Sequence, residues 1–293
     1  MIPAITIVEA HSEREAFDAY RDAAGSAAYY AGGTELLLLL KQGVASYDVL
    51  VDIKGIAGLR EISRPAPDRL RIGACVTHRE IERSALLREV LPLLPAVEHH
   101  VANIRVRNAG TLGGNLCFAE PHSDLTLVTM LLGGQLGVYR NGGMAVLGAD
   151  AFFTGAYETA LEPGDLLAWV EFPVPASGTA FGYQQFRLHE RPSCVVGVVL
   201  EPTADNRACA RAAVGEGAAG LLPHRSRAAE ELLANRSWDD VALAAEDIGN
   251  ILAAESEPLE DLTGSAEYKR HLIEVLGRRA VAEALRQREA SQP

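Results

Sequence analysis

The sequence is poor in cysteine, and this shortage limits the chemistry that the chain can carry alone. It has four cysteines in 293 residues, at positions 75, 117, 194 and 209, and none of them forms a C-x-x-C pair. Scattered thiols are typical of proteins in a reducing compartment, so we expect a cytoplasmic protein. The spacing also argues against an iron–sulfur cluster or a structural zinc ion held by this chain.

Positive charge and long apolar runs are also scarce. Lys and Arg number 27 against 39 Asp and Glu, which gives a formal net charge of -12. Such a chain is a poor candidate for binding nucleic acid or an anionic membrane surface. A membrane span needs about 18 apolar residues in a row, whereas the densest run here, 36–40, is bounded by Glu35 and Lys41. The N-terminus lacks the basic leader of a secretory signal.

The composition that remains is that of a folded protein, and its length suggests one large domain or two ordinary ones. Hydrophobic residues make up 48% of the chain, which is ample for a sizeable core. The proline- and glycine-containing segment 173–178 is the best candidate for a boundary, so we expect domains at 1–175 and 176–293. The second part has strands followed by helices, and we predict an α+β fold.

Local patterns predict most of the elements. Ser12 with Glu15, and Thr77 with Glu80, are spaced as capping boxes that begin helices. A strand, a glycine turn and a short helix ending at Gly43 are expected around 29–43. Segment 103–124 is predicted to be a long functional loop, and the turn at 141–143 to join strands 135–140 and 166–172. Further strands are expected at 5–8, 47–53, 69–73, 182–186, 195–200 and 209–214, and helices at 84–100, 224–234, 238–254 and 265–289.

Two short segments with paired glycines are the strongest chemical signal. The first glycine segment is Ala31-Gly32-Gly33-Thr34-Glu35, and the second is Thr111-Leu112-Gly113-Gly114-Asn115. Glycine lets backbone approach a phosphate closely, and unpaired amides before a helix favour an anion. Two such segments could hold both phosphates of a dinucleotide, although each alone could be an ordinary tight turn. Neither matches the Rossmann or P-loop pattern.

Taken together, the two segments resemble a known family. The run 30–36 is similar to the first flavin loop of the FAD-binding middle subunit of molybdenum hydroxylases, the xanthine dehydrogenase and carbon monoxide dehydrogenase family. The run 107–116 resembles its second loop, and 121–125 continues it. Weaker similarities follow at 195–198, 223–225 and 268–272. The resemblance implies a two-lobed, PCMH-type FAD-binding domain and a small α+β C-terminal domain of the carbon monoxide dehydrogenase flavoprotein type.

The resemblance also implies a set of cofactor-binding residues, with no catalytic residue and no metal ligand in this chain. Asp124 could instead be only a helix N-cap, and Leu167 and Tyr183 could be core residues. A lysine that often follows the aromatic in this family is missing here, and Arg187 is the candidate replacement. The implied set is Tyr30, Ala31, Gly32, Gly33, Thr34, Glu35, Val101, Thr111, Gly113, Gly114, Asn115, Asp124, Leu167 and Tyr183.

Other polar residues leave alternatives open. Neighbouring His99 and His100 point in different directions on a helix and make a poor chelate. His122 could contact or covalently attach a flavin, or be a solvated loop histidine. Arg105 and Arg107 could balance phosphate charge, dock a partner or be a surface pair.

What the resemblance implies for function is electron transfer. The chain would bind FAD, accept electrons from [2Fe–2S] clusters on a small partner subunit, and pass them to an external acceptor. A large partner would carry the molybdenum–pterin cofactor, in a dimer of heterotrimers, and the flavin ring would lie at the junction of the two domains. The alternatives are a self-sufficient FAD-dependent oxidoreductase of the same domain type, and a scaffold that has lost cofactor binding.

Overall fold

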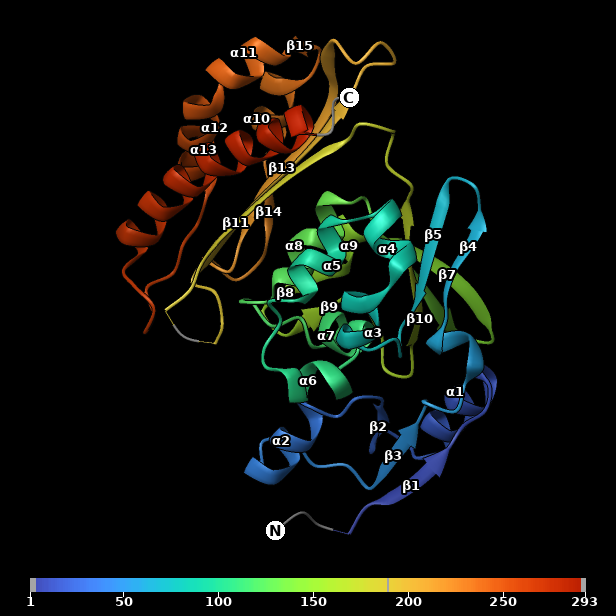
Figure 1. The fold of residues 1–293 in the computed structure, drawn as a ribbon. Helices are drawn as coiled ribbons and strands as arrows, with labels where there is room; N and C mark the ends of the chain where they lie inside the picture. Colours follow the sequence, from blue (N-terminus) through green and yellow to red (C-terminus); the bar gives the residue numbers. More distant parts are fainter. Residues whose placement is uncertain (1–3, 189, 291–293) are drawn as a thin grey trace. The chain divides into compact units, whose positions relative to one another are not determined.

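The computed structural model describes residues 4–188 and 190–290, and its chain forms two compact units (Figure 1). Of the described residues, the first unit takes those up to Glu89, together with Leu94–Ala119 and Gly134–Pro173. The second takes Val90–Leu93, Glu120–Gly133 and those from Val174 onward. Each unit has its own cluster of buried apolar side chains, and the mixture of helices and strands confirms the predicted α+β class.

The first unit begins with a small parallel sheet in the order β1-β3-β2. Its strands are β1 (Thr6–Glu9), β2 (Ala27–Tyr30) and β3 (Val49–Asp52), paired in parallel. Helix α1 (Glu13–Asp22) begins at the predicted Ser12, whose hydroxyl accepts the Glu15 amide. Helix α2 (Leu36–Gln42) ends at Gly43 in the left-handed conformation, where glycine carries no Cβ penalty. Both predicted helix ends are therefore confirmed.

A five-stranded antiparallel sheet forms the rest of the first unit's framework, in the order β4-β5-β10-β6-β7. Asn141 and Gly142 both have positive φ, at 51° and 84°, so they form the tight turn of a hairpin. The hairpin joins β6 to β7, and the prediction that this turn leads directly into residues 166–172 was wrong. The strands are β4 (Ile62–Ala66), β5 (Arg69–Gly73), β6 (Gln135–Arg140), β7 (Gly143–Gly148) and β10 (Leu166–Pro173).

Segment 103–124 is helical, which corrects the prediction of a long loop. Asn103 and Thr111 each cap a short helix with a side-chain oxygen, before α6 (Ile104–Ala109) and α7 (Leu112–Phe118). The glycine pair hid α7, because glycine lowers helix propensity. The other helices and short strands of this region are η1 (Ala57–Arg60), α3 (His78–Arg83), α4 (Ala85–Val90), α5 (Leu93–Glu98), α9 (Ala149–Phe152), β8 (Phe153–Gly155) and β9 (Glu158–Thr159).

The second unit is a sheet with helices on both faces. Its long strands are β11 (Ala180–Phe186), β12 (Cys194–Pro202) and β13 (Ala208–Gly217), and β14 (His224–Arg225) and β15 (Arg236–Ser237) both pair with β13. One face packs against α10 (Arg227–Leu233), α11 (Trp238–Leu243), α12 (Ala245–Glu255) and α13 (Ala266–Ala290). The opposite face packs against α8 (Asp124–Leu131), where Leu131 fills the space beside Gly197.

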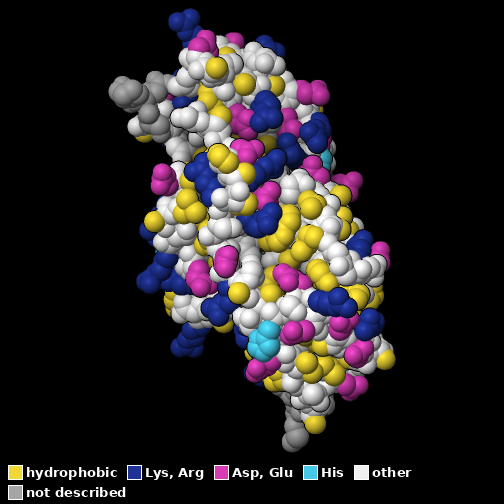
Figure 2. Space-filling view, turned by 90° about the vertical axis from the view of Figure 1, so that its right-hand side faces the viewer, with side chains coloured by type: hydrophobic (Ala, Val, Ile, Leu, Met, Phe, Trp, Pro, Cys, Tyr) yellow, Lys and Arg dark blue, Asp and Glu magenta, His cyan; other side chains and the backbone are white. Residues whose placement is uncertain are grey.

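One face of the protein carries charges of both signs. Acidic and basic side chains are interspersed over the face shown in Figure 2. No described helix is both long and apolar enough to cross a bilayer.

Candidate cofactor site

The first glycine segment joins β2 to α2 and offers backbone donors that the protein does not use. Gly33 has φ of 68°, which turns the chain between strand and helix. Within the described residues, the amides of Gly32, Gly33 and Thr34 donate no hydrogen bond. The segment is only partly buried. A cluster of accessible, unpaired N–H groups is the arrangement that binds an anion such as phosphate.

The second glycine segment forms the start of α7, and its amides are already engaged. Leu112 and Gly113 donate to the carbonyls of Val76 and Ala74, at 3.0 and 2.9 Å. Gly114 donates to the Thr111 hydroxyl oxygen at 3.1 Å, and Asn115 to the Thr111 carbonyl at 3.0 Å. What this segment offers a ligand is therefore the exposed backbone at Gly114, where no side chain stands in the way.

The two glycine segments lie close together, because glycine has no side chain to keep the backbones apart. A Cβ added at Gly32 would lie 2.1 Å from the carbonyl oxygen of Ala109 and 2.8 Å from Cα of Gly110. Gly113 packs against Ala74 in the same way: a Cβ added at Gly113 would lie only 2.5 Å from the Cβ of Ala74. The first segment thus lies against the residues that lead into the second. The fold brings together two motifs that are nearly eighty residues apart in the chain.

Of the other predicted contact residues in the first unit, Tyr30 lies beside the first glycine segment. The Tyr30 ring lies beside Gly33, and the Lys54 ammonium stands 3.8 Å from the centre of that ring. Leu167 is buried in β10, next to the register shift between Leu167 and Trp169. Val101 is partly buried, and its carbonyl accepts a hydrogen bond from Arg107 at 3.0 Å.

Asp124 and Tyr183, both in the second unit, are in direct contact. The Tyr183 hydroxyl donates to Asp124 Oδ1 at 2.6 Å, and Arg187 Nη2 stands 3.8 Å from Asp124 Oδ2. The N-cap of α8 is Ser123 rather than Asp124. Burial and the neighbouring Asp124 charge raise the pKa of Tyr183 well above its usual value, which keeps the phenol protonated as a donor.

His122 is held in an ion-pair network and is not a solvated loop histidine. Its Nδ1 contacts Glu120 Oε1 at 3.0 Å and its Nε2 contacts Asp261 Oδ2 at 3.2 Å. The hydrogen bond to Glu120 is the main cause of its raised pKa. Asp261 also accepts from the fully buried Lys269 at 2.6 Å. Both ring nitrogens are therefore engaged by protein carboxylates.

Arg107 has a structural partner that sequence reasoning missed. Glu82 on α3 is buried and accepts from Arg107 at 3.2 Å, from Arg79 at 2.8 Å and from His99 at 2.8 Å. Burial raises the pKa of Glu82, but the hydrogen bonds of Arg79 and His99 and the charge of Arg107 lower it to about 2. Nothing in the local sequence around Glu82 indicates that it would pair with Arg107. Among the described residues, no group of three His, Cys, Asp or Glu side chains could hold a metal ion.

Comparison with known proteins defines the class to which this fold and site belong. Residues 3–175 match the family model "FAD binding domain in molybdopterin dehydrogenase", and residues 182–284 match "CO dehydrogenase flavoprotein C-terminal domain". The chain belongs to this family of FAD-binding subunits of molybdenum hydroxylases. It is an oxidoreductase flavoprotein subunit, and its cofactor is FAD.

Particular relatives match over nearly the whole length of the chain. The nicotine 6-hydroxylase medium subunit of Paenarthrobacter nicotinovorans is 32% identical over 87% of this chain and 88% of its own. The carbon monoxide dehydrogenase medium chain of Afipia carboxidovorans is 30% identical over 87% of each. Among solved structures, quinoline 2-oxidoreductase from Pseudomonas putida 86 matches with a TM-score of 0.88 and 28% identity, covering 98% of each chain.

Proposed function

We propose that this chain takes electrons from [2Fe–2S] clusters on a small partner subunit and passes them to an external acceptor, while a large partner carries the molybdenum–pterin cofactor. The observation that carries the proposal is the pair of glycine segments joined at Gly32, in a chain whose relatives are named as medium subunits or medium chains. We also propose a cytoplasmic location, supported by the four free cysteines.

The residues present fit the diphosphate of FAD. The unpaired amides of Gly32, Gly33 and Thr34 would donate to phosphate oxygens. The exposed Gly114 would let the second segment approach the same group without a Cβ, and the Thr111 hydroxyl can donate one further hydrogen bond. FAD itself supplies the electron-carrying chemistry when bound. The protein's part is to bind, orient and set the local charge.

We further propose that Asp124 accepts a hydroxyl group of the cofactor. The Tyr183 hydroxyl and the Arg187 guanidinium both face this carboxylate, so they hold it in one orientation. The Arg187 charge is thereby shared with Asp124. We therefore assign Arg187 to positioning Asp124, rather than to replacing the family lysine beside the flavin.

The first test is what purifies with the chain. The protein expressed with its genomic neighbours should bring down a small cysteine-rich chain and a large chain, and acid denaturation should release about one FAD per chain. Flavin with substrate turnover by the isolated chain would instead indicate a self-sufficient enzyme. Colourless protein that FAD cannot reconstitute would indicate a scaffold.

The second test is Gly114→Val, with Gly58→Val as its matched control. A side chain at 114 would meet only the Thr111 hydroxyl oxygen of the protein, at 2.9 Å, and one at 58 would meet nothing within 4 Å. We expect Gly114→Val to bind FAD at least about tenfold more weakly, which corresponds to roughly 1.4 kcal/mol, and to purify with less FAD per chain than the wild type. Thermal unfolding of the apoprotein checks that the fold persists. Full flavin content in the folded Gly114→Val protein would refute the assignment of this segment.

A further inference from the structure

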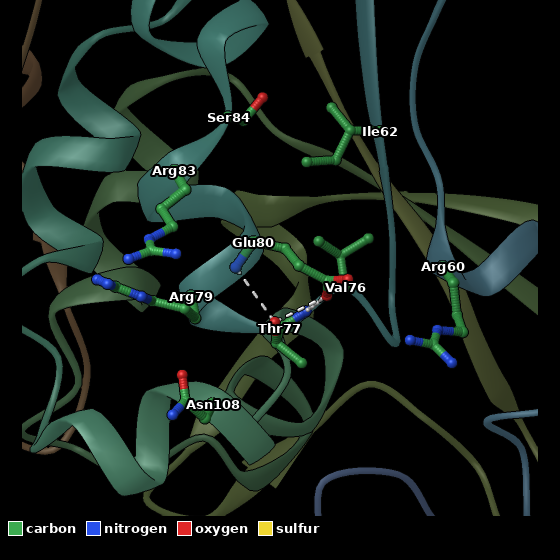
Figure 3. A pocket seen from close by; sticks show the side chains of 9 residues that line it. All are labelled: Arg60, Ile62, Val76, Thr77, Arg79, Glu80, Arg83, Ser84 and Asn108. Carbon is green, nitrogen blue, oxygen red and sulfur yellow. Dashed lines mark hydrogen bonds between the residues drawn. The ribbon is translucent and has the colours of Figure 1, made fainter.

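The first unit has a pocket whose lining does not include the glycines of the two segments. It is an open depression of about 700 Å³ on the surface rather than an enclosed cavity. None of Gly32, Gly33, Gly113 and Gly114 lines it. The residues that matter to its chemistry are Arg60, Thr77, Arg79, Glu80, Arg83 and Asn108 (Figure 3).

The pocket carries a surplus of positive charge. Within the described residues, Arg60 and Arg83 make no hydrogen bond or ion pair. Arg79 pairs with Glu82 at 2.8 Å, but that one carboxylate also serves Arg107. This concentration of guanidinium groups stands out in a chain whose net charge is -12.

The acidic residue in the lining does not remove this surplus. Glu80 turns its Oε2 to the backbone amide of Thr77 at 2.8 Å and to the Thr77 hydroxyl at 2.7 Å. This carboxylate completes the capping box of α3 and is fixed there. Of the three arginines in the lining, Arg79 is paired with Glu82, and the Glu80 carboxylate is held by Thr77.

The basic side chains come from two elements, η1 and α3, and α6 adds Asn108. Arg79 and Arg83 are four residues apart on α3, so they share one face of the helix. Figure 3 shows the guanidinium groups of Arg79 and Arg83 on the same side of α3, projecting away from Thr77, with Asn108 on α6 and Arg60 on the opposite side of Thr77. Like charges at this spacing destabilise a helix unless an anion lies between them. Guanidinium groups bind phosphate and carboxylate through paired hydrogen bonds.

We propose that this pocket binds an anionic small molecule through its phosphate or carboxylate groups. Arg79, Arg83 and the Asn108 amide contact one anionic group, and Arg60 contacts a second part of the ligand from the opposite wall. The ligand is distinct from FAD, and it binds whether or not the flavin is present.

The test is isothermal titration calorimetry of the full chain saturated with FAD. Sodium pyrophosphate and sodium citrate serve as probes in separate titrations at constant ionic strength, so that phosphate and carboxylate recognition are distinguished. We expect one site per chain for at least one probe. Arg60→Gln and Arg83→Gln should each weaken binding about tenfold or more while leaving FAD content unchanged.

The matched control is Arg64→Gln, which removes the same charge from β4 outside the pocket and should change affinity less than about twofold. An equal loss in Arg64→Gln would show general surface attraction and overturn the proposal, as would no binding of either probe at millimolar concentration. Loss of FAD from the Arg60 or Arg83 variants would assign the pocket to the cofactor site instead.

The same titration separates this proposal from the flavin assignment. In Gly114→Val protein without FAD, the probes should still bind, and the arginine substitutions should still weaken them. Binding that disappears in Gly114→Val but survives both arginine substitutions would place the anion at the glycine segments and refute the pocket.

Discussion

Glu216 shows how burial controls the charge of a single residue. It is 3% exposed, on the face of β13 that Val214 also presents to the helices, since side chains two residues apart share a face. Its Oε2 has no hydrogen-bond partner within the described residues. Burial raises the pKa of this carboxyl to about 8, so at neutral pH the folded protein keeps it protonated.

This burial predicts a pH-dependent stability that Glu216→Gln should remove. In the unfolded chain the carboxyl ionises near its ordinary pKa of 4.5, whereas the folded state holds the proton up to about pH 8. Stability should therefore fall as pH rises through this window, by at most about 1.4 kcal/mol per pH unit. Glutamine has no proton to lose, so the free energy of unfolding of Glu216→Gln should not fall in this way. The variant should therefore be more stable than the wild type at pH 8, and the difference should disappear near pH 4.5.

Urea unfolding from pH 5 to pH 8.5 measures the effect. The control is Glu231→Gln, because Glu231 is exposed on α10 and its substitution should leave the pH dependence of the wild type. Parallel stability curves for wild type and Glu216→Gln would contradict a protonated, buried Glu216.

Single residues also show where sequence reasoning stops. The glycine pairs and the position of Asp124 could be found from the sequence. The amides of Leu112 and Gly113, however, donate to the carbonyls of Val76 and Ala74, which lie elsewhere in the chain. No local pattern predicts such partners.

Among the elements, α6 and the first glycine segment form the closest contact of the site. We expect Gly32→Ala to destabilise the protein by about 1–3 kcal/mol, because its Cβ would meet the Ala109 carbonyl at 2.1 Å and backbone must move. Gly58→Ala, which meets nothing within 4 Å, should have a small effect. Denaturant unfolding of both apoproteins measures the difference, and equal stability would show that the contact is loose.

Elements with strong local signals were predicted well, and those that depend on tertiary packing were not. The capping box at Thr77 and Glu80 is complete in the structure, because it needs only residues three apart. Helices α6 and α7 have six and seven residues, too few for a clear periodicity. Packing of Gly113 on Ala74 stabilises α7, and that contact is invisible from the local sequence.

For the whole molecule, two units with separate apolar cores predict unfolding that is not two-state. Calorimetry should give a measured enthalpy larger than the van't Hoff enthalpy. Gly277→Val, whose Cβ would meet Cα of Gly249 at 3.0 Å, should lower the transition of the second unit, and Gly32→Ala that of the first. One transition that both substitutions shift equally would show that the units unfold together.

The contact at Gly32 also limits how the protein can recover from damage there. Its opposing atom is the backbone oxygen of Ala109, which every amino acid carries. No exchange of residue 109 can make room for a larger residue at 32, so a genetic screen for second-site revertants should find changes that shift α6 as a whole, or true reversion to glycine.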